Sequence, residues 1–161
     1  MDLKNEEVIR VSNAIAAGTD DVANCTGVDI SESRQCTFIV ALGAITATGT
    51  VTLSVEASDD DVSYGRLTGV TLTLDAADDN KLGVIEVSGV QNKYVRLVIT
   101  RATANAVIDG AIAVLGRRSL KPIAQGSTVA GTAMFAQPLY VPPTTTAAPT
   151  TTAAPTTTAA P

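Results

Sequence analysis

Hydrophobic residues recur at every second position along much of this chain, which is the spacing of half-buried β-strands. The clearest example is residues 93–101, KYVRLVITR, a β-branched run without Gly or Pro. One face of this run carries Val95, Leu97, Ile99 and Arg101. The pattern predicts a strand that buries this face against a second sheet. Because several other runs alternate in the same way, we expect this strand at the centre of an antiparallel β-domain.

Two further runs, residues 35–43 and 50–58, alternate equally well and are joined by a short connection of small residues ending in Gly49. The apolar side chains that share a face in these runs are Cys36, Phe38, Val40 and Leu42 in the first and Val51, Leu53, Val55 and Ala57 in the second. Alternating runs joined by a Gly-containing loop are typical of a β-hairpin, which we predict here.

Shorter runs complete the set. Residues 6–17 fit a short helix or a first strand about equally well, and we favour a strand because strands follow. Further strands are expected at residues 23–30, 70–74, 82–88 and 107–115, with polar turns between them. Seven or eight short strands at this spacing predict an all-β fold, an antiparallel β-sandwich or jelly roll.

The character of the chain changes after residue 121, because no charged residue follows Pro122. We predict a β-sandwich domain over residues 1–121 and an extended arm over residues 122–143 that packs on the domain or on a neighbouring subunit. Scattered apolar side chains anchor the arm, namely Val129, Met134, Phe135, Leu139 and Tyr140, and the last four are candidates for contact with a partner.

Residues 144–161 are three copies of the hexapeptide TTTAAP. A proline in every six residues interrupts regular hydrogen bonding, and Thr and Ala bury too little surface to offset the entropy of ordering. We expect an extended or disordered tail that acts as a solvated spacer.

Composition narrows the possible functions. Hydrophobic residues make up 45% of the chain but aromatic residues only 3%, which suits a thin sandwich better than an aromatic-lined ligand pocket. The net charge of −5 disfavours nucleic-acid binding, which needs a basic surface. Residues 1–11 lack the apolar stretch of a secretory signal, and no apolar run reaches the length of a membrane span.

Candidate chemistry is sparse. The chain contains no histidine, the commonest general base and metal ligand, and no Gly-rich phosphate loop. Ser54, Ser58 and Ser63 therefore lack the histidine of a hydrolytic triad. Without a visible export signal, Cys25 and Cys36 are expected to be reduced and buried rather than bridged. We predict neither an enzyme nor a cofactor.

Two acidic clusters could bind calcium, a cation that prefers oxygen ligands. They are Asp59, Asp60 and Asp61 in the first and Asp75, Asp78, Asp79 and Asn80 in the second. Neither follows the spacing of an EF-hand loop. Turn residues that accept hydrogen bonds from their own backbone explain them more simply, so we predict no metal site.

Arg117, Arg118 and Lys121 form a basic spot at the end of the predicted domain of an acidic chain. They are either a solvated strand end or a docking site for an acidic partner surface, since complementary charge steers association.

The order of several segments resembles a family of small proteins encoded among the head genes of tailed bacteriophages. The segments are residues 2–5 (DLKN), 13–16 (NAIA), 26–29 (TGVD), 40–46 (VALGAIT), 56–60 (EASDD), 93–96 (KYVR) and 110–118 (GAIAVLGRR). The resemblance runs from Asp2 to about Lys121, and its signal is the order of the segments rather than any single motif. Residues 122–161 are an extension that the shorter family members lack.

The resemblance implies a cement or decoration protein, a β-sandwich or jelly-roll module that binds the major capsid protein, often as a homotrimer. It implies a location on the capsid surface after synthesis in the host cytoplasm, with no nucleic-acid or membrane partner. The alternative is a carbohydrate- or host-surface-binding module of a fibre or adhesin. Sugar-binding platforms usually present aromatic side chains, and Tyr64, Tyr94 and Tyr140 are scattered along this sequence.

Overall fold

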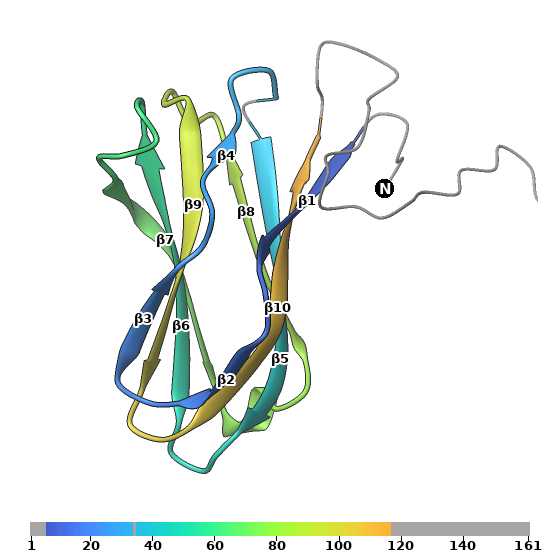
Figure 1. Cartoon of the computed structure of the whole chain (residues 1–161), viewed down its shortest axis with the longest axis vertical. Helices are drawn as coiled ribbons and strands as arrows, with labels where there is room; N and C mark the ends of the chain where they lie inside the picture. The colour runs from blue at the N-terminus through green and yellow to red at the C-terminus, as the bar shows by residue number, and fades with distance from the viewer. Residues whose placement is uncertain (1–5, 34, 117–161) are drawn as a thin grey trace, which may run out of the picture.

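The computed structural model describes residues 6–33 and 35–116, which form two antiparallel β-sheets packed face to face (Figure 1). The predicted all-β sandwich is confirmed. The arm over residues 122–143, the tail over residues 144–161 and the domain boundary at residue 121 lie outside the described residues.

The strands are β1 (Glu7–Ser12), β2 (Ile15–Gly18), β3 (Asp21–Asn24), β4 (Val28–Asp29), β5 (Gln35–Ile45), β6 (Thr50–Ser58), β7 (Gly65–Asp75), β8 (Leu82–Ser88), β9 (Tyr94–Ala102) and β10 (Ala106–Leu115). A 3₁₀ turn, η1 (Ala76–Asp78), leads from β7 towards β8. Among the described residues, no helix has the length and apolar character needed to cross a membrane.

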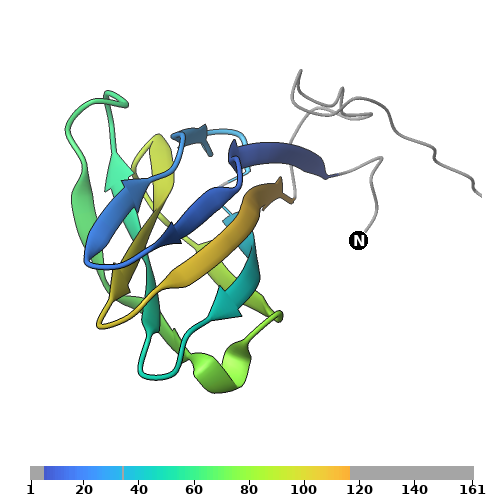
Figure 2. The ribbon, with the colours of Figure 1, turned by 60° about the horizontal axis from the view of Figure 1, so that its bottom comes forward.

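The strand order is that of a jelly roll. Sheet A has the order β1-β10-β5-β8, with β2 also on β10, and sheet B has the order β3-β9-β6-β7, with β4 also on β9. Figure 2 shows β1 and β2 following each other along the orange β10. Each of the pairs β1/β2 and β3/β4 therefore acts as one interrupted strand, which leaves four strands in each sheet and the two Greek keys of a jelly roll.

The first strands follow the sequence only in part. Residues 6–17 are extended, as we favoured, but they divide into β1 and β2, and the register shifts near Ser12. The strand expected over residues 23–30 is likewise divided into β3 and β4. Gly27 lies in the break, where an added Cβ would come within 2.2 Å of the Tyr64 hydroxyl. A side chain at this position would displace the ends of the Asp61 and Tyr64 side chains, so glycine suits the close approach to the loop of residues 59–64.

The predicted hairpin between residues 35–43 and 50–58 is wrong. β5 pairs with β10 and β8 in sheet A, whereas β6 pairs with β7 and β9 in sheet B. The connection between them turns sharply at Thr48, which has a φ of 71°, and passes from one sheet to the other. Both strands alternate because both face the same core, from opposite sides. The hairpin that does form joins β6 to β7 through residues 59–64.

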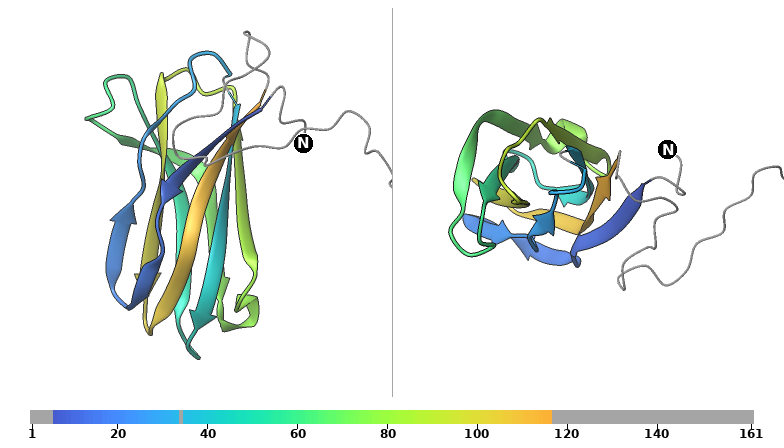
Figure 3. Two further views of the ribbon diagram at one scale, coloured as in Figure 1. Left: turned by 45° about the vertical axis from the view of Figure 1, so that its right-hand side comes forward. Right: turned by 90° about the horizontal axis from the view of Figure 1, so that it is seen from above.

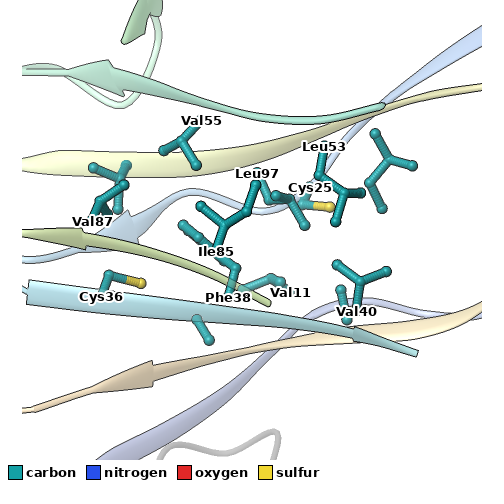
Figure 4. Packing of buried hydrophobic residues seen from close by; sticks show 14 of the residues in the cluster. Val11, Cys25, Cys36, Phe38, Val40, Leu53, Val55, Ile85, Val87 and Leu97 are labelled. Atoms are coloured by element: carbon teal, nitrogen blue, oxygen red, sulfur yellow. The ribbon is translucent and has the colours of Figure 1, made fainter. Parts of the chain in front are cut away.

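The core lies between the two sheets, as the view from above shows (Figure 3). The face predicted for residues 93–101 is buried: Val95, Leu97 and Ile99 are fully enclosed and Arg101 is 3% exposed. β9 lies between β6 and the β3/β4 pair, which confirms its central position. Figure 4 shows Phe38 of β5 and Leu97 of β9 meeting in this core with aliphatic neighbours.

Both cysteines are free and buried, as predicted. Burial raises the pKa of the Cys25 thiol to about 11 and that of Cys36 to about 12. Because the thiolate is the reactive form, both side chains remain weakly reactive thiols at neutral pH.

Candidate binding surface

The outer faces of the two sheets differ in polarity. In sheet B, Thr52 pairs with Thr73 on β7 and with Thr100 on β9, so a row of hydroxyl side chains crosses the sheet. A charged pair lies in a parallel row, where Nε and Nη2 of Arg96 donate to Oε2 of Glu56 at 2.9 and 2.7 Å. This is the polar outer face that an antiparallel sheet normally turns to water.

Sheet A instead presents apolar side chains outwards. On β5, Cys36, Phe38, Val40 and Leu42 point into the core, so Ile39 and Ala41 point outwards. Register then aligns Ile39 with Ile112 on one side and Val84 on the other, and Ala41 with Leu82. We call this surface the apolar face; its residues are Val8, Ile39, Ala41, Leu82, Val84, Ile112 and Val114.

A hollow of about 710 Å³ lies on this face. Ile39, Ala41, Leu82 and Ile112 contribute to its lining, together with Gly110. Two features produce it: Gly110 and Ala41 are opposite each other and have little or no side chain, and the register of β10 shifts beside Gly110. Leu82 is 64% exposed and Val84 52% exposed, so the apolar face lies open at β8, the edge strand of sheet A.

The sequence carried a signal for this surface that we did not use. In residues 35–45, 82–88 and 106–115, both alternating sets contain apolar residues, whereas a strand with one face in water should have one polar set. The contact candidates that we did select all lie outside the described residues: Arg117, Arg118, Lys121, Met134, Phe135, Leu139 and Tyr140. They stay predictions.

The acidic clusters are built as turn caps, as the simpler interpretation predicted. Asp75 accepts a hydrogen bond from the backbone N–H of Ala77, and Asp78 accepts one from the N–H of Asp75, which is the capping box of η1. Asp79 accepts one from the N–H of Ile45 at 2.8 Å. Within residues 6–33 and 35–116, no group of three or more Cys, Asp or Glu side chains is placed to hold a metal ion.

The loop of residues 59–64 is organised around Asp60. Its Oδ1 accepts hydrogen bonds from the N–H groups of Val62 and Ser63 and from the Ser58 hydroxyl. These donors favour the carboxylate and lower the pKa of Asp60 to about 2. The Tyr64 hydroxyl donates to Asp61, and the guanidinium of Arg96 lies 4.0 Å from the centre of the Tyr64 ring. The loop is therefore tied to sheet B at its base.

We predict that the stabilising effect of Asp60 disappears in acid. Because its pKa in the folded protein lies below the ordinary value of 3.8, its contribution is complete above pH 4 and is lost as the pH falls towards 2. The melting temperature of Asp60→Asn should be lower than that of the unmodified protein at pH 5, and the difference should shrink steadily down to pH 2. Asp109→Asn, which removes the same charge from sheet A, is the control. A difference that stayed constant over this range would contradict the prediction.

Two of the three tyrosines are close in space although they are far apart in sequence. Tyr64 and Tyr94 both lie at the end of sheet B that carries Arg96. Burial and the hydrogen bond to Asp61 raise the pKa of Tyr64, and the nearby phenol of Tyr94 adds a smaller effect in the same direction. Arg96 covers the ring of Tyr64, and Nζ of Lys93 lies 4.9 Å from the centre of the Tyr94 ring. Each ring is therefore packed under a cation of the chain itself.

The sequence and the fold were compared with family models, curated proteins and solved structures. No family model matches the chain, and no curated protein matches it. A solved structure described as "CBM4 structure and function" is similar over 76% of this chain and 89% of its own, with 10% sequence identity and a TM-score of 0.33. A TM-score this low supports no argument about function. The fold and the surface define a jelly-roll sandwich with one apolar outer face.

Proposed function

We propose that this chain is a structural protein of a bacteriophage virion, a cement or decoration protein that binds the major capsid protein. It acts through the surface it covers and not by catalysis. The apolar face of sheet A is the observation that supports this proposal, together with the sequence resemblance to phage head proteins. Its site of action is the capsid surface, reached after synthesis in the host cytoplasm.

The apolar face suits a surface that becomes covered in an assembly. Burying exposed apolar surface contributes roughly 25 cal/mol per Å², and complementary protein surfaces of this kind form the cores of interfaces. Leu82 and Val84 are the most accessible side chains of the face and lie next to the hollow, into which a side chain of a capsid subunit would fit. The opposite sheet, with its threonines and ion pairs, is left to face solvent.

Oligomerisation would strengthen such an attachment. A single copy is held by one such face alone, whereas stable interfaces bury roughly 1,000 Å² or more. In a homotrimer three faces engage the capsid together, and linked binding events raise the overall affinity by orders of magnitude. The proposal therefore includes a homotrimer, with neither nucleic acid nor membrane among its partners.

The proposal is tested by sedimentation of the full chain with heads assembled from the major capsid protein alone. Val84→Lys places a charge in the centre of the apolar face and should reduce binding at least about tenfold, which corresponds to about 1.4 kcal/mol. Val22→Lys is the matched control, because Val22 is a strand valine of similar exposure, 61%, on sheet B. Its binding should equal that of the unmodified chain.

Equal binding by the two variants, or no binding by the unmodified chain, would overturn the proposal. Sedimentation without heads gives the oligomeric state, and a monomer that also fails to bind heads would count against the trimer. Carbohydrate binding is the alternative, and binding to a glycan array would revive it. Stacking on a sugar needs an open face of an aromatic ring. Arg96 covers one face of the Tyr64 ring, and Lys93 covers one face of the Tyr94 ring.

A further inference from the structure

The apolar face raises a problem for the protein before assembly. Exposed edge strands with apolar side chains tend to pair with other chains, and β8 carries both Leu82 and Val84 on such an edge. Lys81 and Glu86 lie at and near this strand but do not line the hollow, whose charged lining residues are Arg10 on β1 and Asp109 on β10. An exposed apolar surface of this kind favours association with whatever apolar segment can reach it.

The position of the chain end brings a candidate cover close to the face. The described residues end at Gly116, directly after β10, and β10 contributes Gly110 and Ile112 to the hollow. From Ile112 to the end of β10 the chain advances about 10 Å at 3.3 Å per residue. Residues 117–122 can span up to about 20 Å, which is enough for the chain to return to the hollow.

The composition of the segment that follows matches the surface. Residues 123–141 contain no charged side chain but include Val129, Met134, Phe135, Leu139 and Tyr140. An uncharged segment can lie on an apolar face without burying an unpaired charge, which would be costly. A chain of 19 residues can reach up to about 60 Å at 3.3 Å per residue, which is enough to cross a sheet of four strands.

We infer that residues 123–141 lie on the apolar face of their own chain before assembly and cover the hollow. The inference concerns the regulation of the surface in the proposed function and rests on that function for its biological meaning. A short tether makes self-binding efficient, because effective concentrations within one chain reach the millimolar range. A capsid subunit must then displace the segment. The apparent affinity of the face for the capsid subunit equals the intrinsic affinity multiplied by the fraction of chains whose face is open.

Cross-linking between introduced cysteines tests the contact directly. The native Cys25 and Cys36 are buried and hold their protons at neutral pH, so introduced surface thiols react selectively. The full chain carrying Val84→Cys and Phe135→Cys should form an intramolecular cross-link with a short bis-maleimide. The matched control carries Val22→Cys and Phe135→Cys, which pairs the same segment with the opposite sheet, and should cross-link far less.

Thiol protection gives a second measurement that does not depend on cross-linker reach. In the full chain with Val84→Cys alone, replacing Met134, Phe135 and Leu139 by serine should raise the rate of maleimide labelling about tenfold if nine chains in ten are covered. The same three replacements should leave labelling of Val22→Cys unchanged. Circular dichroism of each variant shows whether the sandwich has folded.

Each outcome decides the inference. The inference would be overturned if position 135 cross-linked equally to positions 84 and 22. It would also be overturned if the serine replacements left the rate of maleimide labelling at position 84 unchanged. Cross-links between two chains would show that the segment covers a neighbouring copy instead. All of these measurements are made without capsids. They can therefore fail while Val84→Lys still abolishes head binding, and they can succeed when the protein binds no head.

Discussion

Replacing Arg101 by methionine should lower the free energy of unfolding by about 2–5 kcal/mol. Arg101 is 3% exposed, and all three nitrogens of its guanidinium donate hydrogen bonds. Nη1 donates to the carbonyl oxygens of Ala16 and Ala106, while Nε and Nη2 donate to the carboxylate of Asp21. One side chain thus joins β9 of sheet B to β2 and to the start of β10 in sheet A. Methionine fills the space but leaves two carbonyls and a carboxylate without their donor.

Denaturant unfolding measures this effect, with Arg66→Met as the control. Arg66 is an exposed arginine on β7 whose Nη2 donates to the Thr71 hydroxyl, so its loss should change stability by no more than about 0.5 kcal/mol. Similar values for the two variants would contradict the structural role of Arg101. The pair with Asp21 also predicts a pH dependence. Hydrogen bonding to Arg101 lowers the pKa of Asp21, so the stabilisation is present above pH 4 and declines in stronger acid.

Phe38→Ala should lower the free energy of unfolding by about 3–5 kcal/mol. Phe38 is fully buried, and it lies beside Ala113 on β10 and Ile85 on β8. It is the one phenylalanine among the described residues, in a core otherwise made of small and branched side chains, so no neighbour is long enough to fill the space it leaves.

The measurement is again denaturant unfolding, and Thr37→Ala on the outer side of the same strand is the control. That substitution should change stability by about 0.5 kcal/mol or less. If both substitutions had equally small effects, Phe38 would not be central to the packing of the two sheets.

The alternation of apolar residues was sufficient to predict strands and their buried faces, but it could not predict partners. Residues 35–43 and 50–58 are adjacent and alternate in the same way, a pattern that predicts a hairpin. Alternation reports only that a strand has a core side, and the two strands face the same core from opposite sheets. The connection reveals the crossing only through backbone geometry, such as the positive φ of Thr48.

Long-range polar contacts were equally hidden. The sequence placed Arg101 on the buried face of its strand, which is confirmed, but gave no reason to connect it with Asp21, 80 residues away. The apolar face shows a third limit, because an outward Ile39 or Val84 becomes meaningful only when register brings both into one row. The contact candidates predicted from the sequence lie within residues 117–140, which are outside the described residues.

The jelly-roll order has a consequence for how the chain reaches its native state. β9 and β10 are interior strands of their sheets and the last strands of the described residues to be synthesised, and each pairs with strands made much earlier. Only the β6–β7 hairpin can form from neighbouring residues, and such non-local topologies fold slowly, in milliseconds to seconds. Sheet B cannot close until β9 ends at Ala102, and sheet A cannot close until β10 ends at Leu115. The nascent chain therefore completes its fold after nearly the whole domain has been translated.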